Sequence, residues 1–286
     1  MKLLKPGILG ASCVLLAAVT LPAQAITLDQ YWGAVGATDR IGDDRFEIRG
    51  YEASRSGNIL TFDIYTYFAG LGDDGVYNGS GSNNPDLTND PEGIGYGDFF
   101  LSDVWTPNTV TANYSSDNAS STPTTTWKFG FAVDDRWKST VADGTTSGDG
   151  ILYKLNSGDN TIDTLLSEDF MSSGIYRTGQ EVAVKTTGGS DLTEINNSLN
   201  SGSGWSITDS STDPLLKKVS FSIDLNGTGL EGSDTFAFHW AMTCANDTIE
   251  DLVLLPAAVV PVPASVWLMG SGLLGLVSIA RRRKRS

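Results

Sequence analysis

One histidine and one cysteine lie close together in the second half of the chain, and a Cys/His pair can form a nucleophile with its base. His239 precedes Cys244 by five residues. In a strand this odd separation places the two side chains on opposite faces. Cys244 would share an apolar face with Trp240 and Met242 as a small buried hydrophobe, whereas His239 would be an exposed or loop-covered polar group. We therefore expect no catalysis by this pair, and one His with one Cys cannot build a His/Cys zinc site.

A second set of candidate ligands lies between residues 73 and 92, where acidic residues and asparagines alternate with glycine. Carboxylate and amide oxygens are the ligands that Ca²⁺ requires. The spacing does not match the EF-hand pattern, and solvated turns have a similar composition, so both readings stay open. The candidate calcium ligands are Asp73, Asp74, Asp86 and Asp90.

Sugar chemistry is the third possibility. Adjacent acids occur at 43–44, 134–135 and 168–169, and a glycosidase needs only two carboxyl groups at a fixed separation. Adjacent acids in turns are more often solvated or paired with arginine, and no pair stands out. An indole ring near a strand end can stack on a sugar, although packing in the core is the alternative. The candidate stacking residues are Trp32, Trp105, Trp137 and Trp205.

The elements that position these residues are predicted to be strands. Apolar and polar residues alternate over 60–68 and 219–225, and a turn at 56–58 joins the first of these strands to 46–49 as a hairpin. In 125–133 the alternation places Trp127 on the same face as Phe129. Further strands are expected at 98–102, 151–155, 181–185, 205–208 and 236–244, and one modest helix around 161–170. This pattern predicts an all-β fold, an antiparallel β-sandwich for which a jelly roll is one arrangement, with long Gly/Ser/Asn/Asp-rich loops.

Charge separates the body of the chain from its ends. The two terminal segments hold seven of the 19 Lys and Arg residues and none of the 34 Asp and Glu residues. The body therefore carries 34 acidic and 12 basic groups, a net charge of −22. Such a surface repels phosphate backbones, so we expect no nucleic-acid partner.

The amino-terminal segment is typical of a signal peptide. Two lysines within Met1–Lys5 precede an apolar run over 8–21, and the small residues Ala23 and Ala25 form a site for signal peptidase. Cleavage there makes Ile26 the new amino terminus. A lipoprotein reading through Cys13 is less consistent, because the apolar run continues well past that residue.

The carboxy-terminal segment combines prolines, an apolar stretch and a basic tail. Residues 264–280 would form a helix about 26 Å long, close to the roughly 30 Å hydrocarbon core of a bilayer. The five basic residues favour the cytoplasmic face, which leaves the body outside. Pro261 and Pro263 cannot lie inside that helix and mark its outer boundary. The residues that define this segment are Pro261, Pro263, Ala264, Arg281, Arg282, Arg283, Lys284 and Arg285.

This ending resembles the PEP-CTERM sorting signal of exosortase substrates in a Val-Pro-x-Pro-Ala variant, with Val262 where the motif usually has Glu. The resemblance covers about the last 27 residues. It implies that an exosortase cleaves near the prolines and releases or transfers the body to the envelope or to extracellular polysaccharide. A permanent single-span anchor is the alternative.

The sequence thus predicts three parts: a signal peptide at 1–25, a secreted β-sandwich at 26–255, and a sorting segment at 256–286 with a basic tail at 281–286. We expect an exported, non-enzymatic surface or matrix protein with a structural or polysaccharide-adhesion role, no certain cofactor, and calcium as a candidate. A secreted glycosidase or other surface hydrolase is the alternative.

Overall fold

The structure is a computed structural model. It describes residues 27–28, 40–42, 46–68, 94–108, 119–120, 123–136, 146–171, 176–187, 192–197, 203–209 and 216–256. The predicted signal peptide, the residues 73–92 and the sorting segment from 257 onward lie outside these ranges. Within them, no helix is long and apolar enough to cross a membrane.

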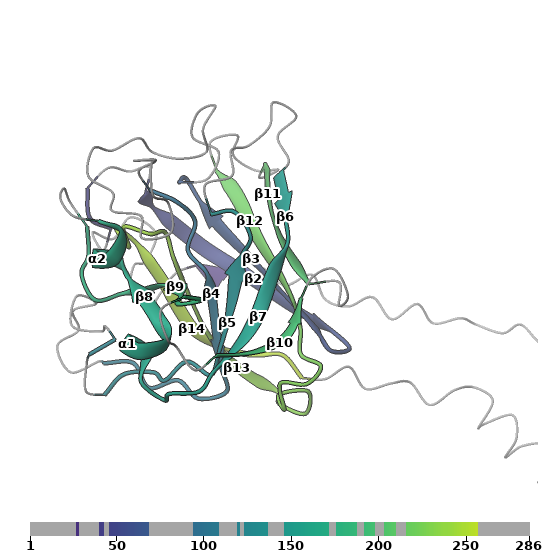
Figure 1. The fold of residues 1–286 in the computed structure, drawn as a ribbon. Helices are drawn as coiled ribbons and strands as arrows, with labels where there is room; N and C mark the ends of the chain where they lie inside the picture. Colours follow the sequence, from purple (N-terminus) through teal and green to yellow (C-terminus); the bar gives the residue numbers. More distant parts are fainter. Residues whose placement is uncertain are drawn as a thin grey trace, which may run out of the picture.

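Two six-stranded antiparallel sheets form the body (Figure 1). Sheet 1 has the order β1-β2-β3-β12-β11-β6, and sheet 2 has the order β10-β7-β5-β4-β13-β14. The strands of sheet 1 are β1 Thr27–Leu28, β2 Ile48–Ser56, β3 Ile59–Thr66, β12 Lys217–Asp224, β11 Gly204–Asp209 and β6 Thr146–Gly148. Those of sheet 2 are β10 Leu192–Asn197, β7 Gly150–Leu155, β5 Phe129–Val133, β4 Phe99–Ser102, β13 Thr235–Ala241 and β14 Thr248–Leu254.

A large aromatic core joins the facing sides of the two sheets. Phe62 of β3 lies 4.7 Å from Phe99 of β4 and 4.9 Å from Phe238 of β13, measured between ring centroids. Phe99 also lies 5.0 Å from Phe221 of β12. Each pair links one sheet to the other, and all four rings are fully buried. The predicted all-β sandwich is therefore confirmed.

The predicted hairpin at 46–68 is also confirmed, with β2 and β3 joined by Gly57 and Asn58. Gly57 has φ +61°, a conformation that side chains disfavour, and it occupies the first central position of a two-residue turn. Glycine at that position is the signature of the type II′ hairpin turn, whose twist matches that of the strands.

A small third layer covers the outer face of sheet 2. Strands β8 Thr164–Leu166 and β9 Glu181–Val184 pair with each other beside the short helices α1 Asn160–Asp163 and α2 Ser167–Phe170 (Figure 1). Beneath this layer lies a second hydrophobic cluster, formed by Phe100, Trp127, Leu155, Val184 and Ala237. Sheet 2 is therefore buried on both faces where the layer covers it.

The third layer explains two differences from the sequence prediction. Trp127 does not share a face with Phe129, because β5 begins only at Phe129 and Trp127 packs into the second cluster while Phe129 packs into the main core. The helix expected around 161–170 is instead two single-turn helices with β8 between them. The pairing of Thr164–Leu166 with β9 overrides the local helical tendency.

Candidate functional site

Two regions of the structure gather polar side chains that could do chemistry, and the first is buried around His239. This residue on β13 is the direct cross-strand neighbour of Glu250 on β14. Its Nδ1 lies 3.2 Å from Oε2 of Glu250, and its Nε2 lies 2.8 Å from the backbone carbonyl oxygen of Glu181 on β9. Because both partners are acceptors, both ring nitrogens are satisfied only when both carry protons. The geometry therefore favours an imidazolium.

The two carboxylates beside His239 have donors of their own. Oε1 of Glu250 accepts hydrogen bonds from Nε1 of Trp105 at 2.6 Å and from the Thr125 hydroxyl at 3.3 Å. Oε1 of Glu181 accepts one from the Asn160 amide at 2.6 Å. These five polar side chains and His239 form what we call the His239 cluster, which connects sheet 2 to the third layer.

Burial and charge act in opposite directions on the titration of this cluster. Burial lowers the pKa of His239, but the hydrogen bond and charge of Glu250, followed by Glu181, outweigh it, so the pKa lies above its ordinary value. For Glu181, burial raises the pKa to about 7 even though the His239 charge lowers it. Near neutral pH the cluster therefore holds protons that the unfolded chain would release.

The His239 cluster is closed to substrates. His239 is 1 % exposed, so the exposed position considered from the sequence is wrong; it is covered, but by strand β9 rather than by a loop. Trp240, Met242 and Cys244 are fully buried in the main core, as predicted. Burial raises the pKa of the Cys244 thiol to about 12, which keeps it protonated and unreactive.

The second region is an open groove of about 440 Å³ along sheet 1, where β6, β11 and β12 lie side by side (Figure 1). Small polar side chains line it: Thr61, Ser147, Ser206, Ser220 and Ser222. The sheet register places Ser206 opposite Ser147 on one side and opposite Ser220 on the other. The Ser220 hydroxyl donates to Asp63 at 2.5 Å.

Two glycines, Gly148 and Gly204, also line the groove. A Cβ on Gly148 would overlap the indole nitrogen of Trp205 and the carboxylate of Asp134, which are joined by a 2.8 Å hydrogen bond. Trp205 and Asp134 are themselves among the lining residues, and Asp149 adds a second carboxylate. We call this region the sheet 1 groove.

The candidate stacking tryptophans have different environments. Trp205 is 3 % exposed, and its ring packs 5.4 Å from Tyr96 in the core, so it offers no open face to a sugar. Trp105 is half-buried, with its N–H bonded to Glu250. Trp32 and Trp137 lie outside the described residues, as do the candidate calcium ligands Asp73, Asp74, Asp86 and Asp90.

The candidate acid pairs are dispersed as well. Asp134 lies in the sheet 1 groove. Asp169 accepts from the backbone N–H of Leu166, and Glu168 accepts from that of Gly179. The pair at 43–44 lies outside the described residues. In the part of the chain that the structure describes, no three His, Cys, Asp or Glu side chains group as metal ligands.

Sequence reasoning missed Glu250 and Glu181 as partners of His239 and missed the hydroxyls of the sheet 1 groove. Glu181 is 58 positions from His239, so only the packing of β9 on sheet 2 reveals their contact. The alternation of Ser206, Ser220 and Ser222 with apolar residues was a usable signal, because it indicates an outward sheet face that carries hydroxyls rather than charges.

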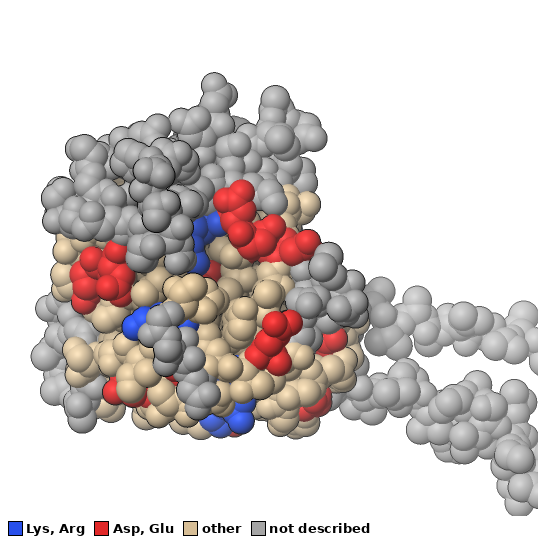
Figure 2. Space-filling view, in the orientation of Figure 1, with Lys and Arg blue, Asp and Glu red and all other residues tan. Residues whose placement is uncertain are grey.

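Acidic side chains gather in several separate groups on the face shown in Figure 2, where basic side chains are fewer. This distribution agrees with the negative charge of the body and disfavours anionic ligands.

The fold is an all-β sandwich with a groove on one sheet. Comparison with known protein families indicates in addition how the chain is sorted. A family model described as the PEP-CTERM protein-sorting motif matches residues 259–284. The chain thus carries, as the sequence resemblance indicated, a signal for export and exosortase-dependent sorting to the cell surface. Comparison with curated proteins and with solved structures gave no significant match.

Proposed function

We propose that the body is a non-enzymatic surface module that binds a polysaccharide in the sheet 1 groove. The observation that carries this proposal is the lining of that groove, in which Thr61, Ser206 and Ser222 present hydroxyls around a floor of glycine backbone. Its volume of about 440 Å³ lies within the range of small-ligand pockets. Hydroxyls and carboxylates supply donors and acceptors for sugar hydroxyls.

The charge of the groove limits the class of polysaccharide. Asp134 and Asp149 line it, and Asp63 accepts from Ser220 beside it. Lys218 forms an ion pair with Asp63 at 3.1 Å, which offsets part of this charge. The remaining negative charge repels uronic or phosphorylated sugars, so the proposed ligand is a neutral glycan. Sorting to the cell surface brings the body to the place where such polymers lie.

A glycosidase remains the second candidate because two carboxylates line the same groove. Asp134 and Asp149 lie close together, since the backbone N–H of Asp134 donates to the carbonyl of Asp149 at 3.0 Å. Paired carboxylates across a sugar ring are the machinery of glycoside hydrolysis. Asp134, however, already accepts a hydrogen bond from Trp205, which favours a positioning role over acid catalysis.

The test is binding to an array of neutral glycans by the body and by Ser206→Leu, which fills the groove without altering its backbone. We expect affinity to fall at least about tenfold, equivalent to ~1.4 kcal/mol. Ser54→Leu is the matched control, because Ser54 lies exposed on β2 of the same sheet, opposite Thr61 but outside the groove lining. Equal loss in both variants, or no glycan binding at all, contradicts the proposal. Release of reducing sugar that Asp149→Asn abolishes would establish the hydrolase instead.

A further inference from the structure

Exposed apolar side chains gather at one corner of the body. Among the described residues, four large hydrophobic side chains are exposed, and three of them are Val104 (55 %), Leu252 (42 %) and Leu254 (68 %). Leu252 and Leu254 project from the same face of β14, because they alternate with the buried Val253. We call Val104, Leu252 and Leu254 the C-terminal corner.

Side-chain contacts bring the segment after β4 to this face of β14. Trp105, the neighbour of Val104, donates its indole N–H to Glu250, which precedes Leu252 by two positions on the same face. In the sheet register Ser102 lies opposite Ala237, and Ala237 lies opposite Leu252. Val104 and the two leucines therefore occupy the same end of the outer face of sheet 2.

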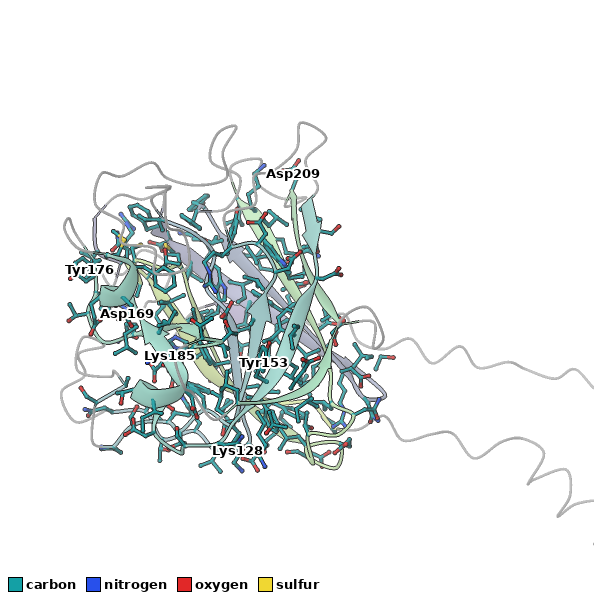
Figure 3. The ribbon with its side chains drawn as sticks, in the orientation of Figure 1. Lys128, Tyr153, Asp169, Tyr176, Lys185 and Asp209 are labelled. Carbon is teal, nitrogen blue, oxygen red and sulfur yellow. The ribbon has the colours of Figure 1, made fainter. Side chains whose placement is uncertain are left out.

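An ion pair borders the corner. Lys128 forms a 2.6 Å ion pair with Asp103, the residue before Val104. In the view of Figure 3, Lys128 lies at the opposite end of the body from Asp209, the last residue of β11. The guanidinium of Arg55 donates to the backbone carbonyls of Ser233 at 2.5 Å and Leu255 at 3.4 Å, which fixes the chain where it leaves β14.

The length of chain after this point limits where the body can lie. Leu255 is still bound through its backbone N–H to the carbonyl of Asp234. Eight residue steps separate Pro256 from Ala264, where the membrane helix is expected to begin, and they span at most about 28 Å. A body of this size has a radius of gyration of about 17 Å, so it cannot move a full diameter away from the bilayer. The short tether keeps the surface around Pro256, which includes Leu254, close to the membrane.

We propose that the C-terminal corner rests on the lipid surface while the sorting segment holds the chain in the membrane. The inference depends on the expected membrane helix at 264–280 and is independent of glycan binding. Lipid is the partner that the observations favour, because the contact is apolar and tethered beside the bilayer. A half-buried tryptophan at the same place fits this interface, where indole rings are enriched. The acidic body excludes attraction to anionic headgroups as the cause.

The experiment uses the chain from Ile26 to Ser286 in phosphatidylcholine vesicles, with a polarity-sensitive dye on Leu254→Cys. Cys244 stays unlabelled because it is fully buried. We expect a quencher attached to lipid headgroups to reduce the dye signal severalfold more than for a dye on Ser54→Cys, on the outer face of sheet 1. The difference should persist at high salt and disappear in the body ending at Pro256.

A second variant separates the apolar contact from simple tethering. With the dye on Val104→Cys, the pair of changes Leu252→Glu and Leu254→Glu should abolish the excess quenching while the chain still floats with the vesicles. Equal quenching of the Leu254→Cys and Ser54→Cys dyes, or a chain that does not float with the vesicles, would overturn the proposal. Unquenched corner dyes together with slower tail removal in cells carrying the two glutamates would assign the corner to a protein partner instead. Glycan binding by the glutamate variant should be unchanged, which keeps this test separate from that of the sheet 1 groove.

Discussion

His239 on β13 and Glu250 on β14 face each other across neighbouring strands, and this pairing helps to fix the register between the two strands. A shift of β14 by one residue would turn Glu250 away from His239 and place an apolar or inward-facing neighbour opposite the imidazolium. Buried ion pairs add little net stability, but leaving one partner alone in the core is costly. The pair therefore excludes the wrong alignment of β13 and β14 more than it strengthens the right one.

The His239 cluster predicts a stability that falls toward alkaline pH. The pKa of Glu181 rises on folding from 4.5 to about 7, so the folded state binds more protons in that interval and stability declines as pH increases through it. His239 acts in the same direction: its pKa is raised, so its contribution is complete below 6.5 and is lost above that pH. A change of this size for Glu181 is on the order of 3 kcal/mol. Urea unfolding at pH 5 and pH 8 measures it.

Glu181→Gln isolates this effect, because glutamine can still accept the Asn160 hydrogen bond but does not titrate. We expect the variant to lose much of the decline between pH 5 and pH 8 and to match or exceed the parent chain at pH 8. A variant whose stability follows the parent curve at every pH would show that Glu181 is not the titrating group.

Cys244 gives a second prediction at this scale. Its thiol is fully buried and its pKa is raised to about 12, so the reactive thiolate is nearly absent in the native protein. Native body should resist alkylation by iodoacetamide at pH 8 and react promptly in urea. Rapid labelling without denaturant would place Cys244 on the wrong face of β13 and its following turn.

The third layer acts as an element that completes sheet 2. The buried carboxylate of Asp98 accepts from the backbone N–H of Val133 at 3.0 Å and from that of Val184 at 2.6 Å. It also lies 3.3 Å from Arg136, yet burial outweighs this partner and raises the pKa of Asp98. One side chain thus connects β5 and β9 through their backbones, and the layer closes over β5 because Gly130 leaves room for it.

Gly130→Ala tests that close approach. The added Cβ would overlap a Val184 methyl and touch the Phe100 ring, so we expect a loss of about 1–3 kcal/mol in unfolding free energy. When Val184→Ala is added, the stability loss of the double variant should be smaller than the sum of the two single-variant losses, because Val184→Ala removes the overlapping methyl group. Gly232→Ala is the control, since nothing lies within 4 Å of its Cβ, and it should be nearly neutral. Additive losses in the double variant would mean that β9 does not press on β5.

The sequence was sufficient to locate most of the strands but not the contacts between elements that are distant along the chain. Residues 60–68 and 219–225 alternate cleanly because one side of sheet 1 faces solvent, and both strands lie where expected. Strands β4 and β9 were also expected, at 98–102 and 181–185, although the third layer buries both of their faces; β14 was missed although its partner β13 was expected. The His239 cluster was hidden because its partners, which are far apart in the sequence, meet only when β9 covers β13. Nothing in the sequence marked the sheet 1 groove except its serines.

At the scale of the whole molecule, the sorting motif at 259–284 predicts that the mature surface protein lacks its C-terminal tail. Residues beyond the Pro261–Pro263 neighbourhood should be absent from protein recovered from the envelope and medium, because we expect those prolines to keep the peptide extended, where an exosortase can cleave it. The mass of the C-terminal peptide, compared between cells with and without the exosortase, measures this.

Neutral replacements of Arg281, Arg282, Arg283, Lys284 and Arg285 should also impair retention before processing, since those charges favour the cytoplasmic side. Recovery of surface protein that still ends at Ser286 in wild-type cells would indicate a permanent anchor. Export would stand in that case, and cleavage would not.

The order of strands in the two sheets has a consequence for the timing of folding during export. β12 lies between β3 and β11, and β13 lies between β4 and β14, so strands near the end of the body complete the middle of each sheet. Asp247 also accepts from the backbone N–H of Ile48, 199 positions earlier. A chain that crosses a membrane amino end first therefore cannot finish either sheet until its last strands emerge, and such distant pairings form slowly. Because the sorting segment follows β14 closely, we expect the body to acquire its structure while that segment is held in the membrane.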